Sequence, residues 1–202
     1  MTNKPFSQAC ENNKRPILDI LTTLFSSNKH VLEIGSGTGQ HAVFFAQHLP
    51  HLTWQTSDLA INHQGINMWL DESALANVQR PIVVDLNKSW PVPNKDLQVD
   101  GVYTANTLHI ISWPLVVKFF EGIAQNLQAE ANVCIYGPFK YQGEFTSESN
   151  ANFDRSLKAR DINSGIRDIE AILRLANSAG LHLINDHVMP ANNQLLFFKK
   201  IK

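Results

Sequence analysis

The sequence has no long apolar run, no excess of charge of either sign and no paired cysteine motif. In its 202 residues, 17 Lys and Arg stand against 18 Asp and Glu, which gives a formal net charge of −1. Bulk charge therefore gives no support to a nucleic-acid or membrane partner. No apolar run approaches the roughly 20 residues with which a helix crosses a bilayer. The two cysteines, Cys10 and Cys134, fit free thiols in a reducing compartment.

Linkers, targeting signals and metal motifs are also missing. No stretch rich in Pro, Gly or Ser divides the chain, so we expect a single domain over residues 1–202. Residues 1–16 lack the apolar core of a signal peptide, which predicts a cytoplasmic protein. The histidines show no spacing such as H-E-x-x-H, so we predict no metal site.

Short apolar segments alternate with segments of helical periodicity along the first two thirds of the chain. Apolar runs bounded by turn signals predict strands, and apolar residues at intervals of three and four predict helices. This alternation is typical of a parallel sheet covered by helices on both faces. We expect strands at 31–34, 52–56, 82–84, 101–104 and 133–136, with helices at 14–25, 40–48, 61–73 and 115–127.

The last third of the chain follows a different pattern. We expect helices at 153–159 and 167–179, the second ended by Gly180, and then strands at 181–188 and 195–198. The short connection MPANNQ allows only an antiparallel hairpin, because a parallel return needs a crossover of about a dozen residues. The prediction is an α/β fold: a Rossmann-like, doubly wound sheet of seven strands, mostly parallel, with one reversed C-terminal strand.

Two segments are candidates for covering a site. The polar stretch 140–152 predicts a long surface loop, and loops of that length in compact domains are usually functional or disordered. We therefore take 140–165 as a candidate lid insertion. Residues 1–28 are expected to form an N-terminal helical cap, with residues 11–13 capping the first helix.

The segment VLEIGSGTGQ holds three glycines, Gly35, Gly37 and Gly39, directly after an apolar run. Glycines this dense indicate a tight turn or a close approach of the backbone to a ligand. In open α/β sheets, ligands bind at the carboxyl ends of the strands, where this loop is expected. A dinucleotide fingerprint G-x-G-x-x-G would need its third glycine at position 40, which is Gln40. This difference disfavours a dinucleotide without excluding it.

The string E-I-G-S-G-T-G resembles the first motif of the class I S-adenosylmethionine (SAM)-dependent methyltransferases. The resemblance implies that the glycines lie beside the methionine part and the ribose of SAM, and that Glu33 holds the amino group of SAM or the loop itself. It also implies that Asp58 accepts from the ribose hydroxyls and that Asp85 accepts from the adenine amino group. A helix N-cap is the alternative role for each aspartate. The implied cofactor-binding residues are Glu33, Gly35, Ser36, Gly37, Gly39, Asp58, Leu59, Asp85, Leu86 and Asn106.

A second resemblance extends over nearly the whole chain. The segments ENNKRPIL, VLEIGSGTGQHAVFFAQHLPHLTWQTSD, NTLHI, YGPFKYQGEFTSESNANFD and MPANNQLLFF closely resemble the methyltransferase-like 26 family, an uncharacterised family. The resemblance implies the same fold and the same cofactor. It adds little about the substrate.

The methyl acceptor is expected over the carboxyl ends of the fourth and fifth strands. There, His109 is the candidate general base, since imidazole titrates near neutral pH, and Asn106 is a candidate for contact with cofactor or substrate. The alternative for His109 is a packing role beside Ile110. The other candidate substrate residues are Asn13, Tyr136, Phe139, Tyr141, Asn192 and Asn193.

The expected activity is in-line methyl transfer from SAM to a small-molecule acceptor. Three alternatives stay open: a SAM-binding protein without catalysis, a protein or RNA methyltransferase, and, less favoured, an NAD-dependent dehydrogenase. RNA docking would require a basic stripe, and the sequence has none. We therefore expect no nucleic-acid or membrane partner, and the oligomeric state stays open.

Overall fold

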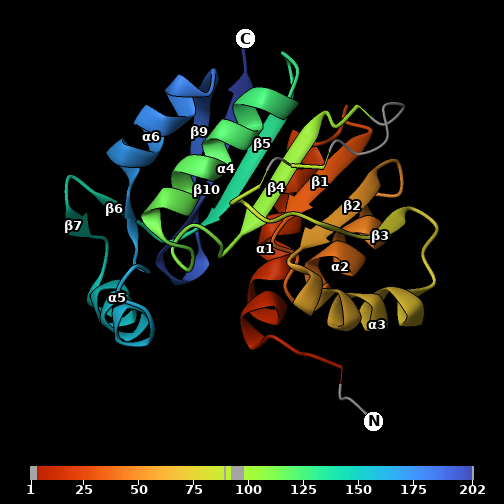
Figure 1. The fold of residues 1–202 in the computed structure, drawn as a ribbon, viewed down its shortest axis with the longest axis horizontal. Helices are drawn as coiled ribbons and strands as arrows, with labels where there is room; N and C mark the ends of the chain where they lie inside the picture. Colours follow the sequence, from red (N-terminus) through yellow and green to blue (C-terminus); the bar gives the residue numbers. More distant parts are fainter. Residues whose placement is uncertain (1–3, 89, 92–97, 202) are drawn as a thin grey trace. The chain divides into compact units, whose positions relative to one another are not determined.

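The computed structural model describes residues 4–88, 90–91 and 98–201 (Figure 1). The chain forms two compact units, Met1–Thr104 (unit 1) and Ala105–Lys202 (unit 2). None of the helices within the described ranges has the length and apolar character needed to cross a membrane.

Unit 1 is built on parallel strands with an aromatic core. The strand β1 pairs in parallel with β2 and β4, and β2 pairs in parallel with β3. The rings of Phe45, Trp54 and Tyr103, all fully buried, have centroids 5.4 to 5.6 Å apart. Its elements are α1 (Gln8–Leu24), β1 (His30–Ile34), α2 (Gln40–His48), β2 (Thr53–Asp58), η1 (Ala60–Asn62), α3 (His63–Ser73), β3 (Val78–Val83) and β4 (Gly101–Ala105).

Unit 2 carries the reversed strand. The strand β10 runs antiparallel to both β5 and β9, and a smaller sheet has the order β7-β6-β8. The helices α4 and α6 lie side by side over β5, β10 and β9 (Figure 1). Its elements are α4 (Trp113–Asn126), β5 (Asn132–Gly137), β6 (Phe139–Tyr141), β7 (Glu144–Phe145), α5 (Glu148–Arg160), β8 (Arg167–Asp168), α6 (Ile169–Ser178), β9 (Leu181–Met189), η2 (Pro190–Asn192) and β10 (Asn193–Lys200).

The predicted fold class is confirmed. Seven strands form a sheet in the order β3-β2-β1-β4-β5-β10-β9, mostly parallel, with β10 reversed. The C-terminal hairpin and the end of α6 before Gly180, which has φ 74°, are also as expected.

Two predicted boundaries in unit 1 are wrong. The first helix begins at Gln8, capped by the Ser7 side chain, so residues 11–13 lie inside the helix and do not cap it. Pro16 is therefore inside the helix, beyond its first turn. The strand β3 begins at Val78 and continues through Pro81, because it is an edge strand, where a residue without an N–H is tolerated.

The predicted loop at 140–152 is also wrong. Most of it is ordered as β6, β7 and the start of α5, which begins at Glu148. The Ser147 hydroxyl accepts from the Asn150 amide at 3.1 Å and starts α5 several residues earlier than the apolar pattern indicates.

Candidate functional site

The loop after β1 has three glycines in the left-handed region. Their φ values are 76° at Gly35, 58° at Gly37 and 89° at Gly39. A Cβ at Gly39 would lie 3.1 Å from the Cα of Ile66, so this glycine lets α3 approach. A Cβ at Gly37 would meet no atom within 4 Å, so the backbone at Gly37 borders open space. The loop thus offers bare backbone to a ligand at Gly37.

The glycine loop is fixed to the neighbouring strand β2. The amides of Gly35 and Ser36 both donate to the Ser57 carbonyl, at 3.1 and 2.9 Å. The Ser57 amide donates back to Ser36 Oγ at 3.1 Å, and Ser57 Oγ donates to the Glu33 carbonyl at 2.6 Å. These bonds hold the loop in one conformation at the end of β1.

Glu33 is a buried carboxylic acid beneath the loop. Its Oε2 accepts from Ser36 Oγ at 2.8 Å and from Trp54 Nε1 at 3.1 Å. Burial raises the pKa of Glu33 to about 7, against the opposing effect of these two hydrogen bonds, and the charge of Asp58 adds to the increase. Its side chain therefore contacts the loop through Ser36 and the core through Trp54.

Asp58 joins the glycine loop to the end of β2. Its Oδ2 accepts from the Gly37 amide at 2.7 Å, and its Oδ1 accepts from the Leu59 amide and from Asn62 Nδ2, each at 2.7 Å. A carboxylate offers about four acceptor positions, so Asp58 retains capacity for a further donor. The N-cap positions of η1 and α3 belong to Leu59 and Asn62, so the alternative of an N-cap at Asp58 is wrong.

Asp85 lies in the turn after β3. Its Oδ1 accepts from the Asn87 amide at 3.0 Å, and its Oδ2 lies 3.5 Å from Lys88 Nζ. The Asn87 amide is the main cause of a lowered pKa of Asp85, and Lys88 adds to it. Asp85 is therefore ionised at neutral pH, and the half-buried Leu86 follows it.

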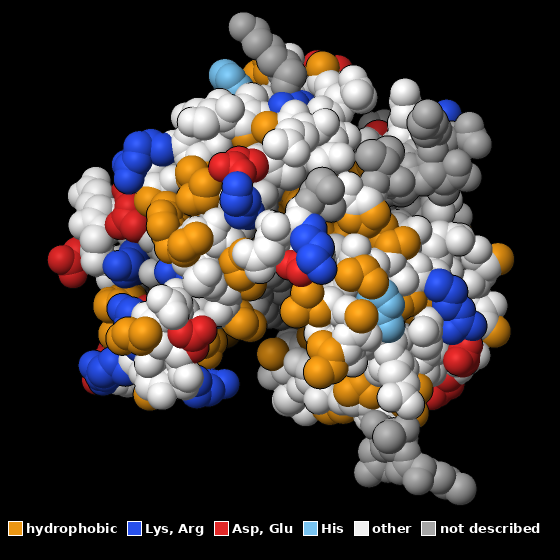
Figure 2. Space-filling view, viewed as in Figure 1, with side chains coloured by type: hydrophobic (Ala, Val, Ile, Leu, Met, Phe, Trp, Pro, Cys, Tyr) orange, Lys and Arg blue, Asp and Glu red, His pale blue; other side chains and the backbone are white. Residues whose placement is uncertain are grey.

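Apolar side chains are exposed next to these aspartates in sequence. Leu59 is 48% exposed, Ile61 85% and Val83 47%, although all three are large hydrophobic residues. Figure 2 shows hydrophobic side chains gathered over the part of the surface where α3 and β3 lie in Figure 1. An apolar surface beside hydrogen-bonding carboxylates is suited to a ligand with a flat ring and a polar edge.

The start of α1 is tied to the glycine loop. The Ser7 amide donates to Gln40 Oε1 at 2.5 Å, and Thr38 Oγ1 donates to the same oxygen at 3.0 Å. Asn13 Oδ1 lies 2.7 Å from Nε2 of the buried His41. Burial lowers the pKa of His41 to about 4, so this imidazole is neutral at pH 7. The Asn13 side chain therefore contacts α2 through His41.

In unit 2, Asn106 follows β4 in the left-handed region, with φ 56°. Its amide donates to the Tyr136 carbonyl at 2.9 Å, which fixes the chain at the end of β5. A non-glycine residue held in this conformation is a form of strain that often occurs at functional sites.

His109 is 4% exposed and packs edge-on against Phe153, with ring centroids 5.4 Å apart. Burial, and then the charge of Arg167, lower its pKa to about 4. The Arg167 guanidinium donates to the Leu108 carbonyl at 2.9 Å and also to the Ile111 carbonyl. These bonds fix the segment that carries His109. The imidazole is a neutral acceptor at pH 7, and its pKa lies well below the neutral range expected from the sequence.

The other candidate substrate residues of unit 2 differ in their surroundings. Tyr136 and Phe139 are 3% and 2% exposed and belong to the core of the unit. Tyr141 is half-buried and donates to Asp186 Oδ2 at 2.5 Å. In the hairpin turn, the Asn192 carbonyl accepts from Asn150 Nδ2 at 2.9 Å, and Asn193 Nδ2 donates to the Pro190 carbonyl at 3.3 Å.

Several residues of these networks were not predicted from the sequence. The only available signal was proximity to a predicted motif: Ser57 precedes Asp58, and Gln40 ends the glycine string. The partners that come from distant segments gave no signal: Trp54, Asp186 and Gln194.

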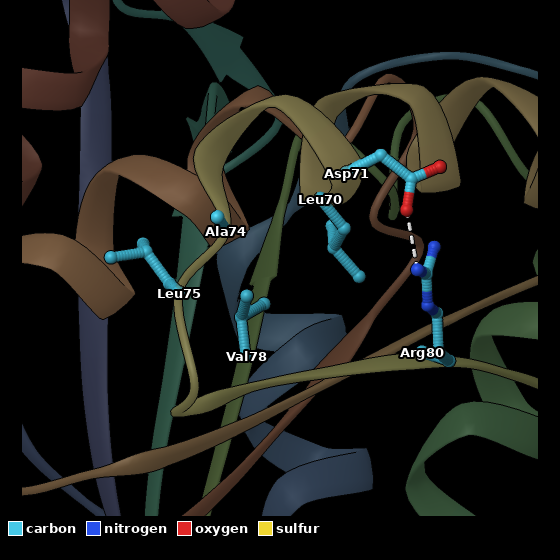
Figure 3. A pocket seen from close by; sticks show the side chains of 6 residues that line it. All are labelled: Leu70, Asp71, Ala74, Leu75, Val78 and Arg80. Atoms are coloured by element: carbon cyan, nitrogen blue, oxygen red, sulfur yellow. Dashed lines mark hydrogen bonds and ion pairs between the residues drawn. The ribbon is translucent and has the colours of Figure 1, made fainter.

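A pocket of about 300 Å³ lies elsewhere in unit 1, between the end of α3 and the start of β3 (Figure 3). An ion pair between Arg80 and Asp71 closes one side of it. None of the predicted site residues lines this pocket, and we assign it no role. Its lining is Leu70, Asp71, Ala74, Leu75, Val78 and Arg80. Over the described residues, His, Cys, Asp and Glu form no group of three or more that could hold a metal ion.

A protein-family model described as "Protein of unknown function (DUF938)" matches residues 4–200. The chain belongs to the DUF938 family. The motif and site residues described above all lie inside the matched range.

Solved structures that share this fold include methyltransferases. An O-methyltransferase family protein from Burkholderia thailandensis has a TM-score of 0.78 at 15% identity, covering 94% of this chain and 56% of its own. A putative O-methyltransferase from Nostoc punctiforme has a TM-score of 0.78 at 18% identity, covering 96% and 58%. Human N-acetylserotonin methyltransferase, solved in complex with SAM, has a TM-score of 0.73 at 13% identity, covering 96% and 58%. This DUF938 chain thus spans little more than half the length of these proteins, and at such identities the likeness establishes the fold.

Proposed function

We propose that this chain is a SAM-dependent methyltransferase that acts on a small-molecule acceptor, and that it is a member of the methyltransferase-like 26 family. The observation that carries the proposal is the bond between Asp58 and the Gly37 amide, 2.7 Å long, at the open side of the glycine loop. It brings the carboxylate to a bare backbone surface while leaving it acceptor capacity. The fold shared with an O-methyltransferase family protein and with a methyltransferase solved in complex with SAM supports the same conclusion.

The residues present fit SAM. Gly37 borders open space, Asp58 can accept a further hydrogen bond, and Asp85 is an ionised acceptor beyond the next strand. The exposed side chains of Leu59, Ile61 and Val83 would suit the adenine ring, which Asp85 and the Leu86 backbone would fix at its polar edge. The residues proposed to hold SAM are therefore Glu33, Gly35, Ser36, Gly37, Gly39, Asp58, Leu59, Asp85, Leu86 and Asn106.

When bound, SAM supplies a methyl group on a sulfonium, so that an in-line displacement breaks a carbon–sulfur bond and leaves a neutral thioether. The acceptor atom forms the new bond to that methyl group and loses a proton if it carries one. In unit 2, the neutral imidazole of His109 is the proposed acceptor of this proton, and Asn106 is proposed to contact the reacting molecules.

The cap and domain assignments are part of the same proposal. We propose one methyltransferase-like domain over residues 1–202, with residues 1–28 as a helical cap. The bonds from Ser7 and Thr38 to Gln40 support a role for the cap in holding the glycine loop. Residues 140–165 remain the proposed lid, formed by β6, β7 and α5 in place of a loop.

A thermal-shift panel with SAM, S-adenosylhomocysteine (SAH), NAD and ATP tests the proposal. A ligand that binds the native state alone raises the Tm by mass action. We expect SAM and SAH to raise the Tm and NAD and ATP to leave it unchanged. A shift with NAD alone would favour the dehydrogenase alternative. SAM binding without methyl transfer to any fraction of a metabolite extract would favour the non-catalytic one.

A further inference from the structure

Three polar side chains of unit 2 meet where β6 approaches β9 and β10. The Tyr141 hydroxyl donates to Asp186 Oδ2 at 2.5 Å, and the Gln194 side chain hydrogen-bonds the same hydroxyl. In the hairpin register, Gln194 lies opposite Val188 and Leu196 lies opposite Asp186. Asp186 and Gln194 are therefore diagonal neighbours on one face of the hairpin.

Two oxygens of this cluster are buried acceptors. Asp186 Oδ1 and Gln194 Oε1 have no hydrogen-bond donor among the residues that the structure describes. Gln194 is 8% exposed, so its amide is removed from bulk water. Buried polar atoms in native proteins almost always have partners, because leaving one without a donor costs free energy. These two oxygens therefore indicate a donor from outside the described chain.

The cluster is also anionic. Asp186 takes part in none of the ion pairs found over the described residues. On the adjoining strands, Lys199 Nζ pairs with Glu130 at 3.1 Å, and Lys140 Nζ lies 5.5 Å from the centre of the Phe145 ring. A cation would balance the charge of Asp186.

The cluster lies at the edge of the unit where β5 ends. Gln194 pairs with Gly137, the last residue of β5. Ligands of open α/β sheets bind beyond the carboxyl ends of the parallel strands, and β5 ends here.

We propose that Asp186 Oδ1 and Gln194 Oε1 bind a protonated amine of the acceptor molecule. This inference rests on the proposed function and names the substrate class: a small molecule with a primary ammonium group. An ammonium group has three donors and a compact positive charge, which complement a carboxylate oxygen and an amide oxygen. A protonated amine has no lone pair, so it anchors the molecule and another atom receives the methyl group.

In this proposal, Tyr141 covers the site, because its hydroxyl is hydrogen-bonded to both Asp186 and Gln194. The turn that follows it is fixed, because the Gly143 amide donates to Asp168 Oδ2 at 2.8 Å and the Gln142 amide donates to Glu170 at 3.2 Å. The half-buried side chain of Tyr141 is held by its hydrogen bond to Asp186. Rotation of this side chain would open the two oxygens to an incoming donor.

The test uses methylammonium as the probe, with tetramethylammonium as a cation that lacks N–H donors. The Tm of the full chain is measured at increasing concentrations of each chloride salt at matched ionic strength. The variants are Asp186→Asn, Tyr141→Phe and, as a control, Glu144→Gln. The control removes one carboxylate at the residue that pairs with Tyr141 across β6 and β7.

We expect methylammonium, and not tetramethylammonium, to raise the Tm of the wild type and of Glu144→Gln. Asp186→Asn should weaken the apparent affinity for methylammonium at least about tenfold. Tyr141→Phe should strengthen this affinity, because it removes the hydrogen bond that holds the Tyr141 side chain to Asp186. Equal effects of the two cations on the wild type would overturn the proposal, as would undiminished protection of Asp186→Asn. The cluster would then be structural, with water on its oxygens. Methylammonium is tested without SAM, so the two proposals can fail separately. The Tm can rise with SAH and not with methylammonium, or with methylammonium and not with SAH.

Discussion

The amide of Gly37 donates to the carboxylate of Asp58 at 2.7 Å, so one side chain joins the glycine loop after β1 to the end of β2. The same carboxylate accepts from the Leu59 amide and from Asn62. Asp58 is thus fixed by three donors before any ligand arrives. A preorganised acceptor loses little side-chain entropy when it binds hydroxyl groups.

Replacing Asp58 tests its proposed role in holding the ribose. Asp58→Asn should weaken SAH binding about tenfold or more, since hydrogen bonds to charged groups contribute about 1.5–3 kcal/mol. Titration calorimetry measures the change. The matched control is Asp71→Asn, which removes an exposed carboxylate of unit 1 that pairs with Arg80. Equal SAH affinity in Asp58→Asn and the control would argue against the role.

Two glycines of the loop should respond differently to alanine. Gly39→Ala places a Cβ 3.1 Å from the Ile66 backbone at φ 89°, so it should lower the free energy of unfolding by about 1–3 kcal/mol. Gly37→Ala meets no atom within 4 Å and should cost about 1–2 kcal/mol from its φ of 58° alone.

The two alanine variants should differ in their affinity for SAH. Gly37→Ala fills the open space beside the loop and should reduce SAH affinity by more than Gly39→Ala does, after correction for stability. Urea unfolding and calorimetry on both variants give the two quantities. Gly37→Ala with undiminished SAH affinity would place the ligand away from this backbone.

Glu33 should make stability depend on pH. The pKa of Glu33 is about 7 in the folded protein, which is above its value in the unfolded chain. The contribution of Glu33 to the free energy of unfolding is therefore fully present below about pH 4.5 and is lost as the pH rises through 7. The total loss is on the order of 3 kcal/mol. Glu33→Gln keeps an acceptor for Ser36 and Trp54 and should remove this dependence. Urea unfolding at pH 5, 6 and 8 measures it, and parallel pH profiles for both proteins would contradict it.

His109 should matter for turnover and not for cofactor binding. His109→Ala should reduce methyl transfer from labelled SAM to a metabolite extract by about 100-fold, the usual contribution of a general base, while SAH affinity changes little. His182→Ala, at an exposed histidine of β9, is the control. A His109→Ala protein with control-level turnover would leave His109 as a packing partner of Phe153.

The order of strands and helices could be predicted because it depends on local patterns. The apolar run before the glycines and the short MPANNQ connection each allow few structures. The start of α1 was missed because its cap, Ser7, precedes six mostly polar residues that carry no apolar stripe. The segment 140–152 was missed because β6 pairs with β8, which is distant in sequence.

The candidate site, like the fold, could be predicted from the sequence only in part. Glu33, the glycines, Asp58 and Asp85 stand at strand ends that the sequence marks. The partners that determine their chemistry come from tertiary contacts: Trp54 reaches Glu33 across the sheet, and burial sets the pKa values of Glu33 and His109. Asp186 and Gln194 become neighbours through the β9–β10 register, which no local motif encodes.

A crystal structure of the chain with SAH would show directly whether Asp58, Asp85 and the Gly37 backbone bind the cofactor. We predict that the ribose hydroxyls bind Asp58, the adenine amino group binds Asp85, and the ligand covers the backbone at Gly37. Electron density for SAH at another place, with both aspartates free of it, would contradict this assignment of the cofactor site.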